Sequence, residues 1–191
     1  MANNMTAEQL KEKYRSFLKT EFTVFDLETS GLDPARDEIL EIAGIRLRGG
    51  EELARFEALI RPTRPIAPEV EKINGLNEIY LLVNGRPGSQ VLAEFLSFAG
   101  DSIMVGHNIK DFDWLFVLSH VQRHALSAPQ NKMIDTLELS RKLLSLPQYN
   151  LTAVARHFGH ENRNAHRAMP DVEVNAKVFI NLMEQMLKVN D

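Results

Sequence analysis

The chain has 191 residues, enough for one domain with a sizeable core or for one domain and a small appendage. It has no cysteine, which excludes disulfides, thiolate metal sites and cysteine nucleophiles and favours a cytoplasmic location. The net charge of -4 argues against a basic protein that coats nucleic acid, and no apolar run approaches the roughly 20 residues of a membrane span, so we expect no membrane partner.

The first segment, residues 6–20, is predicted to be a helix because Tyr14, Phe17 and Leu18 recur at helical spacing. We expect an N-terminal helix within residues 1–19 that packs on one main domain, residues 20–191.

Three strands are predicted next. Residues 22–28 read as a buried strand, and residues 38–62 read as a hairpin of two apolar-rich runs that turns at Gly49 and Gly50. Antiparallel pairing of these three strands follows from the short connections.

The rest of the chain alternates between helical and extended patterns. The predicted elements are a short helix ending near Gly75, helices over 89–100 (capped by Ser89), 111–124, 136–146, 149–159 and 168–189, and strands over 101–106 and 131–135. In the last helix, Pro170 falls in the first turn, where proline is tolerated. This order predicts an α/β domain with a mixed central sheet, three antiparallel strands and flanking helices.

Two carboxylates continue an apolar face of the first strand. Asp26 and Glu28 share the face of Phe22 and Val24, because side chains alternate along a strand. Like charges on a largely buried surface are unfavourable unless protons or cations compensate them. Two interpretations stay open for this stretch alone: a metal or catalytic site, or a strand-end aspartate that caps the following turn.

Two further acids fall on core-facing stripes of helices. Asp113 shares a stripe with Phe116, Val117 and Val121, and Asp171 shares one with Val174, Val178 and Leu182. Each alone is explained by the favourable interaction of an acid with a helix N-terminus. Four convergent carboxylates are better explained by two divalent cations, Mg²⁺ or Mn²⁺, in a two-metal site for displacement at phosphorus.

His166 precedes the helix that carries Asp171. An imidazole beside carboxylates can accept a proton from water, although a lone histidine here also fits an ordinary surface loop.

Three stretches, "FDLETSGLDP", "VGHNIKDFDWLF" and "HRAMPD", resemble in order the exonuclease motifs of the DnaQ-like 3′–5′ exonucleases of the DEDDh type. The similarity runs from about residue 20 to about residue 187. It implies an RNase H-like fold, with His166 as general base and with catalytic metal ligands at Asp26, Glu28, Asp113 and Asp171.

The second motif contains two acids. Asp113 is the predicted ligand because it shares the face of Phe116 and Val117, which leaves Asp111 as a helix cap. Asp135 matches no ligand motif and is interpreted as structural.

The resemblance also implies a pocket for the terminal nucleotide. Leu32 should wedge against a base, and the other pocket residues should be Thr29, Ile73, Asn74, His107, Asn108 and Phe112. Asn74 stands where relatives often have histidine, which affects the nucleotide contacts and not the reaction.

The predicted function is a metal-dependent 3′–5′ exonuclease that releases nucleoside 5′-monophosphates from single-stranded nucleic acid, with DNA favoured over RNA. The alternatives are an RNA-trimming exoribonuclease and a non-catalytic module that binds nucleic acid or a polymerase; all four site acids are present, which disfavours the second. The predicted partners are 3′ ends of single strands and, by resemblance to proofreading subunits, a DNA polymerase.

Overall fold

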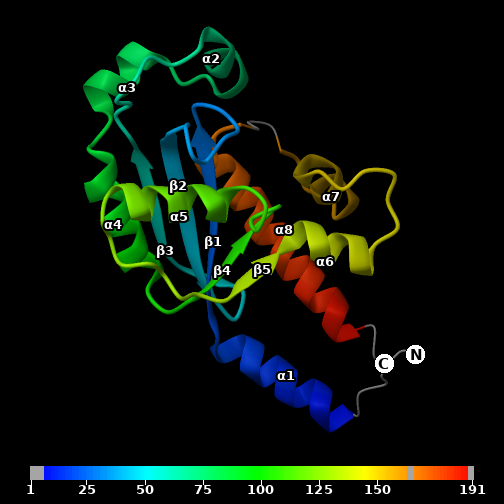
Figure 1. Cartoon of the computed structure of the whole chain (residues 1–191). Coiled ribbons are helices and arrows are strands. Elements are labelled where there is room, and N and C mark those ends of the chain that lie inside the picture. The colour runs from blue at the N-terminus through cyan, green and yellow to red at the C-terminus, as the bar shows by residue number, and fades with distance from the viewer. Residues whose placement is uncertain (1–6, 163–165, 189–191) are drawn as a thin grey trace.

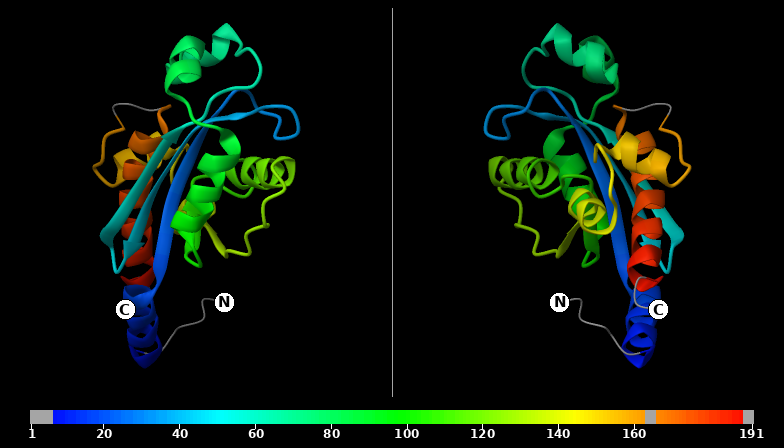
Figure 2. Two further views of the ribbon diagram at one scale, coloured as in Figure 1. Left: turned by 90° about the vertical axis from the view of Figure 1, so that its left-hand side faces the viewer. Right: turned by 90° about the vertical axis from the view of Figure 1, so that its right-hand side faces the viewer.

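The computed structural model describes residues 7–162 and 166–188, which form three layers around a central sheet (Figure 1). The strands are β1 (Glu21–Thr29), β2 (Ile39–Arg48), β3 (Glu51–Leu59), β4 (Ile103–Gly106) and β5 (Met133–Asp135). The helices are α1 (Ala7–Lys19), α2 (Pro68–Asn74), α3 (Glu78–Asn84), α4 (Gly88–Ala99), α5 (Asp113–Arg123), α6 (Thr136–Leu143), α7 (Leu151–His157) and α8 (Ala168–Lys188). Figure 2 shows α8 on one face of the sheet and α4 and α5 on the other.

The sheet is mixed, with the strand order β3-β2-β1-β4-β5. The first three strands pair antiparallel, whereas β4 and β5 run parallel to β1. The hairpin turns at Gly49 and Gly50, whose positive φ values of 59° and 85° suit glycine. The predicted mixed sheet with three antiparallel strands is confirmed.

The central strand β1 divides the core into two parts. Phe22 and Val24 pack toward α8, and the ring of Phe22 lies 5.0 Å from that of Phe179. Phe25 and Leu27 pack toward α4 and α5, and the ring of Phe25 lies 5.3 Å from that of Phe95. The predicted alternation is confirmed, and it directs Asp26 and Glu28 to the α8 side.

A bulge follows the second of these acids. Glu28 is the register partner of Glu41, but the next residue of β1, Thr29, pairs with Ile39, so Leu40 is an extra residue in β2. Leu40 packs with Leu76 and Leu81 beside helices α2 and α3. The bulge thus anchors the α2–α3 arm near the end of β1 that carries the acids.

The N-terminal helix α1 contacts the sheet layer through Phe17, whose ring lies 5.5 Å from Phe22 and 6.4 Å from Phe179. The division of the chain at residue 19 stays a prediction. Within residues 7–162 and 166–188, none of the helices combines the length and the apolar character that crossing a membrane requires.

Three local details differ from the sequence-based expectations. Helix α3 was not predicted; its start is marked by Asn77, whose side chain accepts from the Tyr80 N–H. Ser89 is not the cap of α4, because the helix already begins at Gly88. The cap position is occupied by Pro87, which has no N–H to satisfy.

Asp111 is not a helix cap either. Its backbone N–H bonds to the Asn108 carbonyl in a turn, and Phe112 occupies the cap position of α5 with φ -135° and ψ -84° and no side-chain cap. The helix therefore starts at Asp113, two residues later than predicted.

Candidate active site

Three of the four predicted acids form a tight cluster. Asp26 and Glu28 from the end of β1 and Asp171 from the first turn of α8 offer carboxylate oxygens that all lie within 4.8 Å of one another. Asp113, at the start of α5, is 3% exposed and adds the largest repulsion that Asp26 receives from a neighbouring charge. The fold thus brings four acids from three elements to one place.

The electrostatics of the cluster oppose ionisation. Burial raises the pKa of Asp26 well above its usual range, and the neighbouring acids, Asp113 first, raise it further. Burial, with repulsion from Asp171 and Glu41, raises the pKa of Glu28 to about 7. Burial also raises the pKa of Asp113 to about 8, although hydrogen bonding with the backbone of Leu27 and of Asp113 itself acts in the opposite direction.

This arrangement fits divalent cations. The donors are all carboxylate oxygens, which are the ligands of hard cations such as Mg²⁺ and Mn²⁺. A cation would relieve the repulsion that now raises the pKa values of Asp26 and Glu28.

Asp171 is held in place on both oxygens. The backbone N–H of His166 donates to Oδ2 at 2.8 Å, and Nδ2 of Asn162 donates to Oδ1 at 2.6 Å. His166 is exposed, and its φ of 68° is in the left-handed region, which a non-glycine residue rarely adopts. The predicted base, His166, therefore lies beside the acid cluster and has a left-handed backbone conformation.

One cavity of about 390 Å³ adjoins the cluster, and every site residue predicted from the sequence lines it. These residues are Asp26, Glu28, Thr29, Leu32, Ile73, Asn74, His107, Asn108, Phe112, Asp113, His166 and Asp171. Leu27, Gly31 and Val70 also line it and were not predicted. Leu32 is 83% exposed and Ile73 is 62% exposed, so both offer apolar surface at the cavity.

Asn74 and His107 have defined partners in the cavity wall. Asn74 is buried, and its Oδ1 accepts from the Leu76 N–H at 3.0 Å. His107 Nε2 donates to the Tyr149 carbonyl at 2.8 Å, and its Nδ1 lies 3.0 Å from Oγ1 of Thr136. Burial lowers the pKa of His107, so the imidazole serves as a neutral part of the wall.

Asp135 holds backbone in position. Its Oδ1 accepts from the N–H groups of Asn108, Leu137 and Glu138, which caps α6 and supports the left-handed Asn108 at φ 66°. The structural interpretation of this acid is confirmed.

A second cavity, of about 500 Å³, meets the first one at Asp26, His107, His166 and Asp171. Its remaining wall consists of Gln148, Asn150, Leu151, Thr152, Ala153, Arg156 and Asn162. Sequence reasoning missed this wall because these residues belong to no acidic motif; the cap signal of Asn150, which accepts from the Ala153 N–H, marks only the start of α7.

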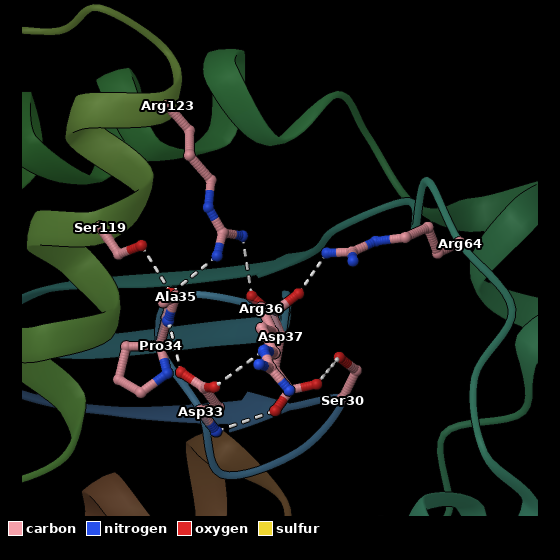
Figure 3. A network of polar contacts seen from close by, with 9 residues as sticks. All are labelled: Ser30, Asp33, Pro34, Ala35, Arg36, Asp37, Arg64, Ser119 and Arg123. Carbon is pink, nitrogen blue, oxygen red and sulfur yellow. Dashed lines mark hydrogen bonds and ion pairs between the residues drawn. The ribbon is translucent and has the colours of Figure 1, made fainter.

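The loop that carries Leu32 is cross-linked to α5 (Figure 3). Arg123 donates to the carbonyls of Pro34 at 2.7 Å and Asp37 at 2.8 Å, and the Ser119 hydroxyl donates to the Pro34 carbonyl at 2.5 Å. Inside the loop, the Asp37 carboxylate accepts from the Asp33 N–H at 2.8 Å. The backbone around Leu32 is therefore held by a polar network that the exposed leucine does not join.

Two further features of this loop are the close approach of Gly31 to Asp37 and a hydrogen bond from Arg64. A Cβ at Gly31 would lie 2.3 Å from Oδ2 of Asp37, so a larger residue here would force the Asp37 side chain to shift out of the network. Arg64, from the connection after β3, donates to the Arg36 carbonyl on the other side of the loop.

Comparisons with known proteins agree with this geometry. The family model RNase T, described as an exonuclease, matches residues 23–179. The chain is 34% identical over 167 residues to DNA polymerase III subunit epsilon of Aquifex aeolicus, an alignment that covers 86% of this chain and 81% of the relative. It is 38% identical over 168 residues to the PolC-type DNA polymerase III of Thermotoga maritima, covering 88% of this chain but only 12% of that much longer protein.

Solved structures show the same fold. Exonuclease I matches with a TM-score of 0.79 at 22% identity, covering 87% of this chain and 41% of that protein. A complex of Escherichia coli exonuclease I with a dT13 oligonucleotide matches with a TM-score of 0.77 at 21% identity, covering 90% of this chain and 42% of that protein. The predicted RNase H-like fold and the resemblance to DnaQ-like 3′–5′ exonucleases are thereby confirmed. The chain carries a 3′–5′ exonuclease domain and belongs to the RNase T exonuclease family.

Proposed function

We propose that the protein removes nucleotides one at a time from the 3′ end of single-stranded DNA and releases nucleoside 5′-monophosphates. The observation that carries this proposal is that Asp26, Glu28, Asp113, Asp171 and His166 all line the cavity of about 390 Å³. An acid cluster with raised pKa values beside an open cavity is typical of a catalytic centre.

The four acids would hold two divalent cations, Mg²⁺ or Mn²⁺, which when bound stabilise negative charge on the attacking and leaving oxygens at phosphorus. The His166 imidazole takes the proton of the attacking water, because it is exposed to solvent and lines the cavity beside the acid cluster. The backbone N–H of His166 and the amide of Asn162 orient Asp171 during the reaction.

The terminal nucleotide occupies the cavity of about 390 Å³. The exposed Leu32 and Ile73 provide apolar contact with a base, and apolar contact of this kind accepts every base and suits a degradative enzyme. Thr29, Asn74, His107, Asn108 and Phe112 form the remaining wall.

A DNA substrate and a polymerase partner are supported by the relatives. Two of them are DNA polymerase III proteins, and a structural neighbour was solved with a DNA oligonucleotide. We infer that the protein acts on DNA in the cytoplasm, in association with a DNA polymerase.

Product analysis on 5′-labelled single-stranded oligonucleotides tests this function. DNA and RNA of equal sequence are incubated with the protein and Mg²⁺, Mn²⁺ or EDTA. We expect a ladder that shortens from the 3′ end, is abolished by EDTA, and forms faster on DNA. A faster ladder on RNA would instead identify an exoribonuclease.

The matched control compares Asp26→Ala with Asp111→Ala. Asp26 lies in the acid cluster, whereas Asp111 is exposed and lines neither cavity. Near-normal activity of Asp26→Ala would refute the proposed site, whereas Asp111→Ala should remain active. Absence of cleavage with either metal would favour a binding module.

A further inference from the structure

Glu41 is a completely buried carboxylate outside the acid cluster. It is the third residue of β2, is 0% exposed, and accepts three hydrogen bonds. Arg167 Nη2 donates to Oε1 at 2.7 Å, Arg167 Nε donates to Oε2 at 3.0 Å, and the Ala168 N–H donates to Oε2 at 3.0 Å. A planar guanidinium that binds both oxygens fixes orientation as well as distance.

The two residues that donate hydrogen bonds to Glu41 lie next to the candidate base, His166, and close in sequence to Asp171. Arg167 directly follows His166, and Ala168 is the first residue of α8, which carries Asp171 three residues later. The His166 N–H also bonds to Asp171. One carboxylate on β2 therefore fixes the backbone between the base and the acid.

Glu41, the acidic partner of this ion pair, lies on the strand next to β1, which carries Asp26 and Glu28. Glu41 is the register partner of Glu28 on β1, directly before the bulge. The ion pair thus links the strand that carries Asp26 and Glu28 to the segment that carries His166 and Asp171, across 126 residues of sequence. Neither Glu41 nor Arg167 lines either cavity at the acid cluster.

We propose that the Glu41–Arg167 ion pair is a positioning device for the reaction, which sets His166 and Asp171 against Asp26 and Glu28. The inference rests on the proposed function for its kinetic consequence. Misplacement of a reacting group by about 1 Å can cost about 100-fold in rate, and loss of a group that orients a metal ligand typically costs about 10- to 100-fold in metal affinity or activity.

The test compares Arg167→Met with Arg55→Met. Arg55 on β3 also pairs with an acid of α8, Glu173, so the control removes a sheet-to-helix ion pair without touching residues 166–168. Both variants are assayed well below their melting temperatures, and each is checked for folding by circular dichroism. We expect Arg167→Met to lower kcat about 10- to 100-fold with KM within about threefold, because no cavity contact is lost. Arg55→Met should match the wild type.

Removal of Arg167 alone leaves Glu41 buried without its guanidinium, which can destabilise the fold. The double variant Glu41→Gln with Arg167→Met removes both charges, and the amide oxygen can still accept from the Ala168 N–H. A double variant that unfolds at the wild-type temperature but has low kcat supports positioning. Wild-type kcat in a folded double variant overturns the proposal.

Affinity for Mn²⁺, measured by calorimetry, separates this inference from the proposed function. We expect Arg167→Met to bind Mn²⁺ about tenfold more weakly and Arg55→Met to bind it normally. If the wild type proves inactive on oligonucleotides but this difference in affinity is found, the proposed function fails and the positioning role stands. Equal Mn²⁺ affinities in all three proteins, together with unchanged kcat where activity exists, would show that the pair only stabilises the fold.

Discussion

Glu28 and Glu41 are register partners on neighbouring antiparallel strands, and their charges are treated differently. Glu41 is paired with Arg167, whereas Glu28 faces the cavity with its pKa raised to about 7. Like charges directly opposite each other destabilise a sheet. The fold thus neutralises one glutamate with an internal cation and leaves the other to take a proton or an external cation.

Affinity for divalent cations should therefore depend on pH. Binding requires Glu28 and Asp113 to lose their protons, whose pKa values are about 7 and about 8. We expect calorimetry to show Mn²⁺ affinity rising from about pH 6 to about pH 8. Affinity that is constant over this range would contradict the assignment of these acids as ligands.

Stability without metal should show the opposite trend. The folded-state pKa values of Glu28 and Asp113 lie above their ordinary values, so the folded protein binds more protons than the unfolded chain between those limits. The contribution of these two groups to the free energy of unfolding then falls as pH rises from about 4 to about 8. Urea titrations in EDTA and in saturating Mn²⁺ measure this: the decline should be steeper in EDTA.

Asp26→Ala should abolish metal-dependent cleavage while the metal-free protein stays folded. Asp113, Asp171 and Glu28 all repel the Asp26 carboxylate, so its removal relieves unfavourable interactions. We expect an unfolding free energy in EDTA at least equal to that of the wild type. Near-normal nuclease activity in this variant would refute the proposed site.

The two acids of the second motif can be separated. Asp113→Ala should be inactive, because Asp113 is buried beside the cluster, whereas Asp111→Ala should retain activity, because Asp111 is exposed outside the cavities. The reverse result in the oligonucleotide assay would show that Asp111 is the ligand.

His166→Asn should lower kcat by about 10² to 10⁴, the usual contribution of a general base. Asparagine tolerates the left-handed backbone at φ 68°, so the substitution removes the imidazole with little added strain, and the N–H bond to Asp171 is kept. Mn²⁺ affinity measured by calorimetry should be unchanged. Joint loss of metal binding and activity would assign His166 a structural role.

Arg123→Met should loosen the loop of Leu32 and raise KM for oligonucleotides by up to about tenfold, the equivalent of ~1.4 kcal/mol, with kcat little changed. Arg36→Met is the matched control, since Arg36 lies in the same loop but its side chain pairs within the loop, with Asp33. Steady-state kinetics of both variants measure the effect. Equal KM values in the two variants would show that the α5 cross-link does not affect substrate binding.

Much of the fold could be predicted because its signals are local. The alternation along residues 22–28 and the glycine pair at 49–50 determine the first three strands without knowledge of the remainder. Helix α3 was missed altogether, and the other two differences concern helix starts, where a turn at Asn108 or the proline at position 87 decides between positions two residues apart. Such choices depend on backbone geometry that spacing alone does not reveal.

The sequence predicted the acids of the site but not the residues that hold them in position. Asp26, Glu28 and Asp171 stand out because charges on apolar stripes need an explanation. Glu41 had the same signal, a charge within the apolar run 39–45, but its partner Arg167 is distant in sequence and belongs to a helix start. Only the packing of α8 on the sheet brings the pair together.

The division of the core by β1 has a genetic consequence. Even-numbered residues of this strand face α8 and odd-numbered ones face α4 and α5, so loss of a single codon at Val24 would exchange the two sets beyond that point. Phe25 would turn toward α8, while both carboxylates would turn into the apolar layer. An in-frame deletion of one residue in β1 would therefore be far more damaging than most substitutions there, because it misdirects the core and the acids together.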